Sequence, residues 1–195
     1  MKFIRFAIAS AALAVLAAPV AAQLANAGLD FVQAIRSRDG NKATQVLQEH
    51  PNVIDATDDK GNSGLIISIL RSDEDYVSFL LSKGADPNLK GAGGDTPLIV
   101  ASRIGFGQAV QWLLGEGAKI DETNNMGETA LIAAVQQRQA PIVRILLAAG
   151  ANPDKTDAAQ GFSARQYAER DNRGREILRM IETKKPKPAA ATTSR

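Results

Sequence analysis

The sequence predicts an all-α fold, a solenoid of stacked helix–turn–helix units with projecting β-hairpin-like turns. The first observation is an internal repeat, because Gly84, Gly117 and Gly150 each lie 33 residues apart. The second is a helix-start signal, in which Thr96 can cap a helix whose first residue is Pro97. The third is composition, since alanine and leucine dominate and aromatic residues make up only 5% of the chain.

Each unit contains two short apolar segments with helical spacing. Leu98 and Ala101 would lie on one face of the first helix, and Val110 and Leu113 on one face of the second. Helices of two or three turns are marginal alone, because isolated helices below about 12–15 residues are weakly stable in water. We therefore expect neighbouring units to stack on these faces, and Gly117 to end the second helix in a left-handed conformation.

The repeated motifs carry a family resemblance. Gly94-Asp95-Thr96-Pro97-Leu98, Val110, Leu113-Leu114 and Gly117-Ala118 follow one another at the spacing that the neighbouring units share. The sequence resembles the ankyrin repeat family, whose 33-residue unit carries G-x-T-P-L, V-x-x-L-L and G-A-D/N. The resemblance implies a scaffold for protein–protein recognition without built-in chemistry. One departure is isoleucine at the position where the family usually has histidine after T-P-L, at Ile66, Ile99 and Ile132.

The repeat divides the chain into an ankyrin repeat domain with two flanking segments. The end units are expected to be atypical because one side of each faces solvent, and the last contains one inserted residue near 158–160. The predicted segments are a signal peptide at 1–22, an N-terminal cap at 23–57, repeats at 58–90, 91–123 and 124–157, a C-terminal cap at 158–182, and a disordered basic tail at 183–195.

The first residues have the composition of an export signal. Lys2 and Arg5 precede an apolar run from Phe6 to Val20, and small residues lead to Ala22. The run of about 15 residues is shorter than the ~20 that span a bilayer. We expect a secreted bacterial protein, cleaved after Ala22 and located in the periplasm without stable membrane insertion. An uncleaved anchor is the alternative.

Composition restricts the chemistry. The chain has no cysteine, so disulfides and thiolate sites are excluded, and its only histidine, His50, leaves little room for zinc, haem or Ser-His-Asp chemistry. Residues 23–182 carry 17 basic and 21 acidic residues, a net charge of −4, which argues against a protein that binds nucleic acid. The glycines at 91–94 could suggest a phosphate loop, but no Gly-Lys-Ser/Thr follows them, and a hairpin tip is the preferred interpretation. No cofactor or metal is predicted.

Core positions are used for packing, so function is expected on the concave face, which we define as the turn tips plus the exposed side of the first helices. Leu70, Ile104 and Met126 are apolar at positions expected to face water, and Arg71 and Arg103 flank them. An ordinary solvated surface is the alternative. The predicted partner-binding residues are Asp59, Lys60, Asn62, Leu70, Arg71, Asp95, Arg103, Ile104, Asn125, Met126, Glu128, Gln136 and Gln137.

Other residues have simpler interpretations. The acidic run from Asp73 to Asp75 could bind a cation but suits the first turn of a helix, and Trp112 and His50 are expected to have structural roles. The main functional hypothesis is a non-catalytic, monomeric module that binds a protein partner in the cell envelope. The alternatives are a structural or envelope-tethering protein that uses the basic tail, an accessory regulator of a periplasmic enzyme, and an enzyme.

Overall fold

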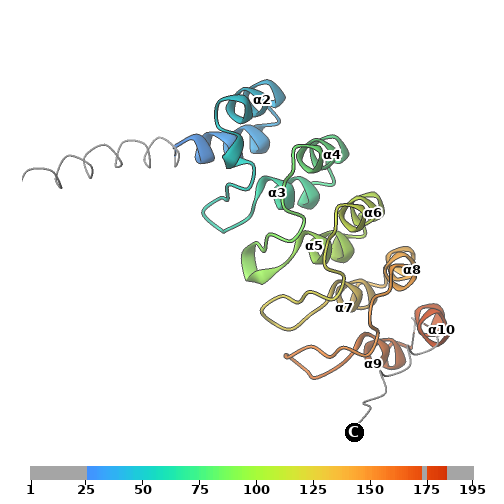
Figure 1. Ribbon diagram of the computed structural model, residues 1–195. Helices are drawn as coiled ribbons and strands as arrows, with labels where there is room; N and C mark the ends of the chain where they lie inside the picture. The colour runs from blue at the N-terminus through green and yellow to red at the C-terminus, as the bar shows by residue number, and fades with distance from the viewer. Residues whose placement is uncertain (1–25, 173–174, 184–195) are drawn as a thin grey trace, which may run out of the picture.

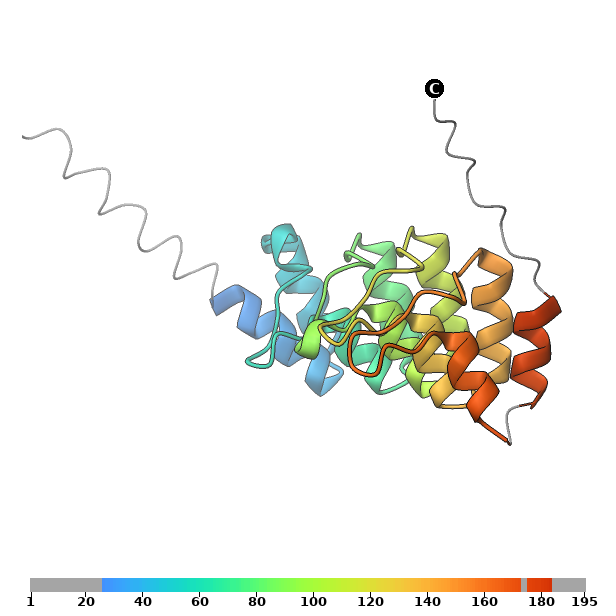
Figure 2. The same cartoon turned by 90° about the horizontal axis from the view of Figure 1, so that it is seen from below.

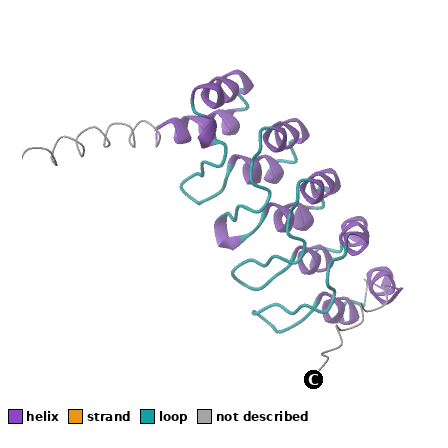
Figure 3. Ribbon diagram, viewed as in Figure 1, coloured by secondary structure: helices purple, strands orange, loops and turns teal. Residues whose placement is uncertain are grey.

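The computed structural model describes residues 26–172 and 175–183, which form five pairs of short helices and, within these ranges, no strand (Figures 1 and 3). The all-α solenoid is therefore confirmed. The pairs are the helical residues 26–37 with α2 (Gly40–Glu49), α3 (Gly64–Leu70) with α4 (Glu74–Ser82), α5 (Pro97–Ile104) with α6 (Gly107–Gly115), α7 (Ala130–Gln136) with α8 (Ala140–Ala149), and α9 (Ala164–Arg170) with α10 (Arg175–Thr183). Short 3-10 helices occur at η1 (Pro51–Val53) and η2 (Ala92–Gly94).

The predicted signal peptide lies outside the described residues, and so does the predicted tail except for its first residue. Thr183 was expected to be disordered but is the last residue of α10, where its hydroxyl donates to the carbonyl of Met180 at 3.0 Å. The helical segment therefore extends one residue past the predicted boundary.

The helix pairs stack into two rows. The first helices of successive units, α3, α5, α7 and α9, pack on one another, and so do the second helices α4, α6, α8 and α10. Figure 1 shows that the loops before the first helices project to one side and that the stack bends toward that side, and Figure 2 shows the units side by side in chain order. This arrangement gives the molecule the concave face that the repeat predicts.

Hydroxyl side chains start the first helices. The Thr96 hydroxyl accepts the backbone N–H of Ile99 at 3.2 Å, and Pro97 is the first helical residue. The position that the family usually fills with histidine is completely buried here, so its isoleucines contribute to the core. The same cap is made by Ser63, Thr129 and Ser163.

The core is a ladder of equivalent side chains. Leu80, Leu113 and Leu146 are each 0% exposed, and burying a leucine stabilises a fold by roughly 1.5–3 kcal/mol. The second helices end near glycines with φ of 85° at Gly84 and 105° at Gly150, values that favour glycine. The units therefore repeat each other in backbone as well as in packing.

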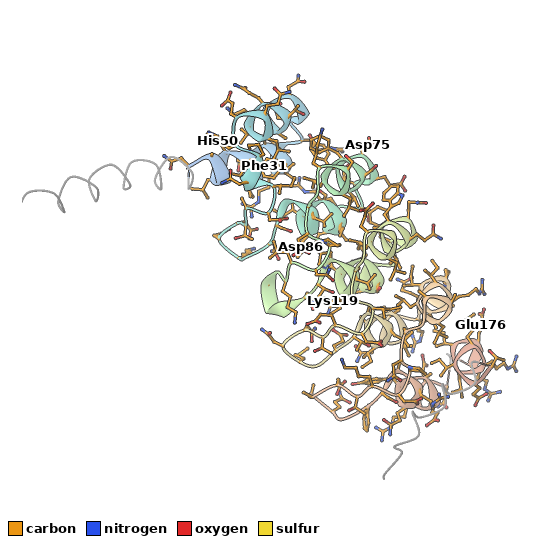
Figure 4. All side chains as sticks on the ribbon, viewed as in Figure 1. Phe31, His50, Asp75, Asp86, Lys119 and Glu176 are labelled. Atoms are coloured by element: carbon orange, nitrogen blue, oxygen red, sulfur yellow. The ribbon has the colours of Figure 1, made fainter. Side chains whose placement is uncertain are left out.

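A second ladder joins the segments that follow the second helices. The side chain of Asn88 accepts the backbone N–H of Lys119 at 2.8 Å and donates to the carbonyl of Gly117 at 3.2 Å. Figure 4 labels Asp86 and Lys119, which occupy equivalent places in successive units. Equivalent bonds run from Asp86 N–H to Asp55 and from Asn152 N–H to Asp121.

The insertion expected near 158–160 is visible in the last turn. An isolated antiparallel bridge joins Thr123 to Thr129, six residues apart, whereas the corresponding bridge from Thr156 to Ser163 spans seven. The turn is therefore one residue longer in the last unit, and the helix that follows it keeps its N-cap.

Candidate functional site

The turn tips are held by their own side chains. The Oδ1 atom of Asn124 accepts two backbone N–H groups, from Met126 and Glu128, each at 3.0 Å. Such side-chain-to-backbone bonds fix a tight turn without help from the rest of the fold. Asp58 and Asp157 make the same kind of contact at the start of their tips.

Successive tips also bond to each other. The Asn62 side chain accepts the N–H of Ala92 at 3.0 Å. The Asn125 N–H donates to Gly93 at 3.1 Å, and the Ala158 N–H donates to Met126 at 2.8 Å. The four tips therefore form one hydrogen-bonded row, which presents their side chains from a fixed backbone.

An ionic network joins the third and fourth units. Arg103 on α5 bonds Asp95 with both terminal nitrogens, at 2.5 and 3.1 Å, and reaches Glu128 at 2.5 Å. The Asn124 amide donates to the same two carboxylates at 2.7 and 3.0 Å. Because Glu128 is only 7% exposed, most of this network is shielded from water.

The network changes the acidity of its members. Burial alone raises the pKa of Asp95, but the hydrogen bonds from Arg103 and Asn124 outweigh it, and the pKa is lowered overall. The pKa of Arg103 is raised, first by its hydrogen bond to Asp95. Asp95 and Arg103 therefore stay ionised at neutral pH, and the carboxylates of Asp95 and Glu128 are both engaged by Arg103 inside the protein.

The predicted site residues divide into two groups. Arg103 donates to both Asp95 and Glu128, and Arg71 donates to the backbone carbonyl of Arg36 at 2.7 Å. These side chains hold neighbouring units together. Asn62 is half-buried, and the remaining predicted residues are exposed, namely Asp59, Lys60, Leu70, Ile104, Asn125, Met126, Gln136 and Gln137.

The apolar members of the second group are the most exposed large hydrophobic side chains on this face. Leu70 at the end of α3 is 54% exposed, Ile104 at the end of α5 is 39% exposed, and Met126 in a tip is 57% exposed. Helices α3, α5 and α7 pack in sequence, so the three side chains come from adjoining units. Exposed apolar side chains on a rigid face are typical of a surface that contacts a partner.

No partner-binding residue was predicted in the last unit of the concave face. An open hollow between α7 and α9 is lined by Val135, Gln136, Tyr167, Arg170 and other polar residues. Burial raises the pKa of Tyr167, and its hydroxyl donates to Asp157 at 2.5 Å. Extending the repeat register across the inserted residue would have placed Arg170 at the position of Arg103.

The other candidates have the structural roles expected of them. Asp73 is the N-cap of α4 and accepts the N–H of Tyr76, and His50 is the C-cap of α2. Trp112 is partly buried against the core. In residues 26–172 and 175–183, no group of three or more His, Cys, Asp or Glu is placed to hold a metal ion, and no helix has the length and apolar character to cross a membrane.

A family model described as ankyrin repeats in three copies matches residues 89–157. This stretch contains α5 to α8, the ionic network and two of the four tips. Residues 89–157 are therefore ankyrin repeats. Ankyrin repeats generally mediate protein–protein interaction and are typically non-catalytic. In these ankyrin repeats the exposed tips and the ends of the first helices are the side chains that the fold leaves free for contact.

Proposed function

We propose that this chain is a non-catalytic module that binds a protein partner in the bacterial periplasm, using the concave face. The exposure of Leu70 and Ile104 at the ends of first helices, and of Met126 in the hydrogen-bonded row of tips, carries this proposal. A preorganised backbone lowers the entropy that a surface loses on binding, so apolar contacts made there contribute more to affinity. The basic N-terminal segment and its apolar run support export.

Site-specific photocrosslinking in the native compartment tests the surface. A photoreactive amino acid at Gln137 should capture a protein partner, which mass spectrometry would identify. The same amino acid at Gln111, exposed on the second-helix row in α6, is the matched control and should capture it less. Equal capture from both positions would place the partner elsewhere.

Charge substitution tests the apolar contacts. Leu70→Asp combined with Met126→Asp should abolish capture at Gln137, because a carboxylate cannot enter an apolar contact without losing its hydration. Gln111→Asp adds a charge elsewhere and should have no effect. Arg103 is unsuitable for this purpose, since its removal would leave two shielded carboxylates without their cation.

Location is tested separately. The mature protein should be released with the periplasmic fraction and should begin at Gln23 when sequenced. A protein that retains Met1 and sediments with membranes would instead be an anchored form, and the proposed compartment would need revision.

A further inference from the structure

Arg103 and Arg170 occupy the same place in their units, seven residues after the N-caps Thr96 and Ser163. In each unit the arginine meets the residue that precedes its N-cap. For Arg103 this residue is Asp95, and the guanidinium is also bonded by Glu128 of the next unit. The chain itself therefore shows that an arginine at this place binds carboxylates.

Arg170 meets an aromatic ring instead. Its guanidinium carbon lies 3.7 Å from the centroid of the Phe162 ring, which holds the group by stacking but does not neutralise it. Within the part of the chain that the structure describes, no carboxylate forms an ion pair with Arg170. Residues 1–25, 173–174 and 184–195 contain no Asp or Glu side chain. Arg170 is thus a fixed cation without an acidic side chain of its own.

The hollow beside Arg170 has the character of a subsite for one side chain. Val135, 4% exposed, gives it an apolar wall, and the exposed amides of Gln136 and Gln160 add polar groups. Arg138 and Asp171 also line it, but they form an ion pair, in which two Arg138 nitrogens donate to the Asp171 carboxylate at 2.6 and 3.1 Å. The charge available for a ligand is therefore that of Arg170.

We propose that this hollow binds the carboxylate of an aspartate or glutamate side chain in a protein partner. A guanidinium stacked by its face keeps its edge N–H groups free for a bidentate bond, the geometry that favours carboxylates. The inference rests on the proposed function, because the hollow belongs to the same concave face. A glutamate would place its methylene groups near Val135 and its carboxylate at Arg170.

The probe for this subsite is N-acetyl-glutamate N-methylamide, whose only carboxylate is on the side chain. Titrated into the isotopically labelled full chain, it should give saturable NMR shifts at the Arg170 Nε–H and at the Gln160 backbone amide. The neutral glutamine analogue should give none. Arg170→Gln should raise the dissociation constant at least about tenfold, since a charge-assisted bond is lost. Arg179→Gln, the same change at an exposed arginine of α10, should leave the dissociation constant unchanged.

A second variant keeps the result interpretable. Phe162→Leu retains the charge of Arg170 but removes the stacking surface, so binding should weaken less than in Arg170→Gln. Circular dichroism would confirm that both variants remain folded. Shifts that do not saturate, or that persist in Arg170→Gln, would overturn the proposal. Tighter binding of N-acetylalanine, which carries a terminal carboxylate, would overturn the assignment to a side chain.

The two experiments together distinguish a wrong proposed function from a wrong subsite. If Arg170→Gln abolishes binding of the glutamate probe and also reduces photocrosslinking to the partner at Gln137, both stand. If the partner is captured equally well by Arg170→Gln, the function stands and the acidic-residue assignment falls. If the probe binds but no partner is captured at Gln137, the subsite stands and the proposed function falls.

Discussion

Replacing Gly127 by alanine tests whether contact between neighbouring tips stabilises the solenoid. Gly127 has φ of 74°, and a Cβ atom there would lie 2.6 Å from the backbone nitrogen of Ala158 in the next tip. That nitrogen donates the 2.8 Å bond to the carbonyl of Met126. Gly61 occupies the same position two units earlier with φ of 82°, but a Cβ atom there would meet nothing within 4 Å.

The difference between the two glycines can be estimated. Gly61→Ala adds only the strain of a left-handed alanine, which lowers the free energy of unfolding by about 1 kcal/mol. Gly127→Ala adds the same strain and the loss of the Ala158 to Met126 hydrogen bond, about 1 kcal/mol. Displacing the crowded backbone costs about 1 kcal/mol more. We expect a total near 3 kcal/mol for Gly127→Ala.

Urea unfolding followed by circular dichroism measures both changes. If the free energy of unfolding falls by about 2 kcal/mol per molar urea, the urea concentration at the unfolding midpoint should fall by about 0.5 M for Gly61→Ala and about 1.5 M for Gly127→Ala. Repeat proteins can unfold in steps, so amide hydrogen exchange at Ala158 gives a local second readout. Equal midpoints and unchanged protection at Ala158 would show that contact between tips adds no stability.

Three further substitutions have directions set by the structure. Ser102, 0% exposed, has a hydroxyl that makes no hydrogen bond within the described residues, so Ser102→Ala should raise the free energy of unfolding by about 1 kcal/mol, measured in urea. Ser72 has φ of 53°, so Ser72→Gly should raise the free energy of unfolding by about 0.5–1 kcal/mol, and the melting temperature with it. An unchanged melting temperature would mean that the left-handed strain is negligible. The pKa of Asp95 is lowered on folding, so its contribution is present above the ordinary value of 3.8 and is lost as pH falls through the folded pKa. Asp95→Asn should therefore lose less stability than the wild type between about pH 4 and pH 2, and parallel pH profiles would contradict this.

The repeated elements could be predicted because their chemistry is local. A threonine before a proline is a helix-start signal within a few residues of sequence, and a glycine that needs positive φ is specified by its own backbone. Thr96 and Gly150 were assigned correctly for this reason. The leucine ladder followed from the 33-residue period alone, since equivalent residues of stacked units must meet.

The internal bonding of the concave face could not be predicted in the same way. Arg103 lies 25 residues from Glu128, and their contact depends on how one tip sits against the next. The repeat register predicts that both residues belong to the same face, but not that they bond each other. The inserted residue in the last tip shifts the 33-residue register by one. Arg170 therefore matches Arg103 only when positions are counted from the N-cap Ser163.

Each unit has a pair of positions on the concave face whose side chains differ from one unit to the next. One is the residue before the N-cap, and the other lies seven residues after the cap, at the end of the first helix. The pairs are Asn62 with Leu70, Asp95 with Arg103, Glu128 with Gln136, and Phe162 with Arg170. The caps and the core do not depend on Leu70, Gln136 or Arg170, so a substitution there can change the surface while the scaffold persists, whereas Asp95, Arg103 and Glu128 also join neighbouring units.

The order of the pairs constrains any partner. The first pair offers an apolar side chain, the second is neutralised internally, and the last offers a fixed cation on an aromatic ring. A partner that used one unit alone would gain little, because an exposed apolar contact and an exposed ion pair are each weak. A segment that reaches both Leu70 and Arg170 must cross α5 and α7, where Ile104 and Gln137 are exposed. We therefore expect an extended partner segment with an apolar residue toward one end and an acidic residue toward the other.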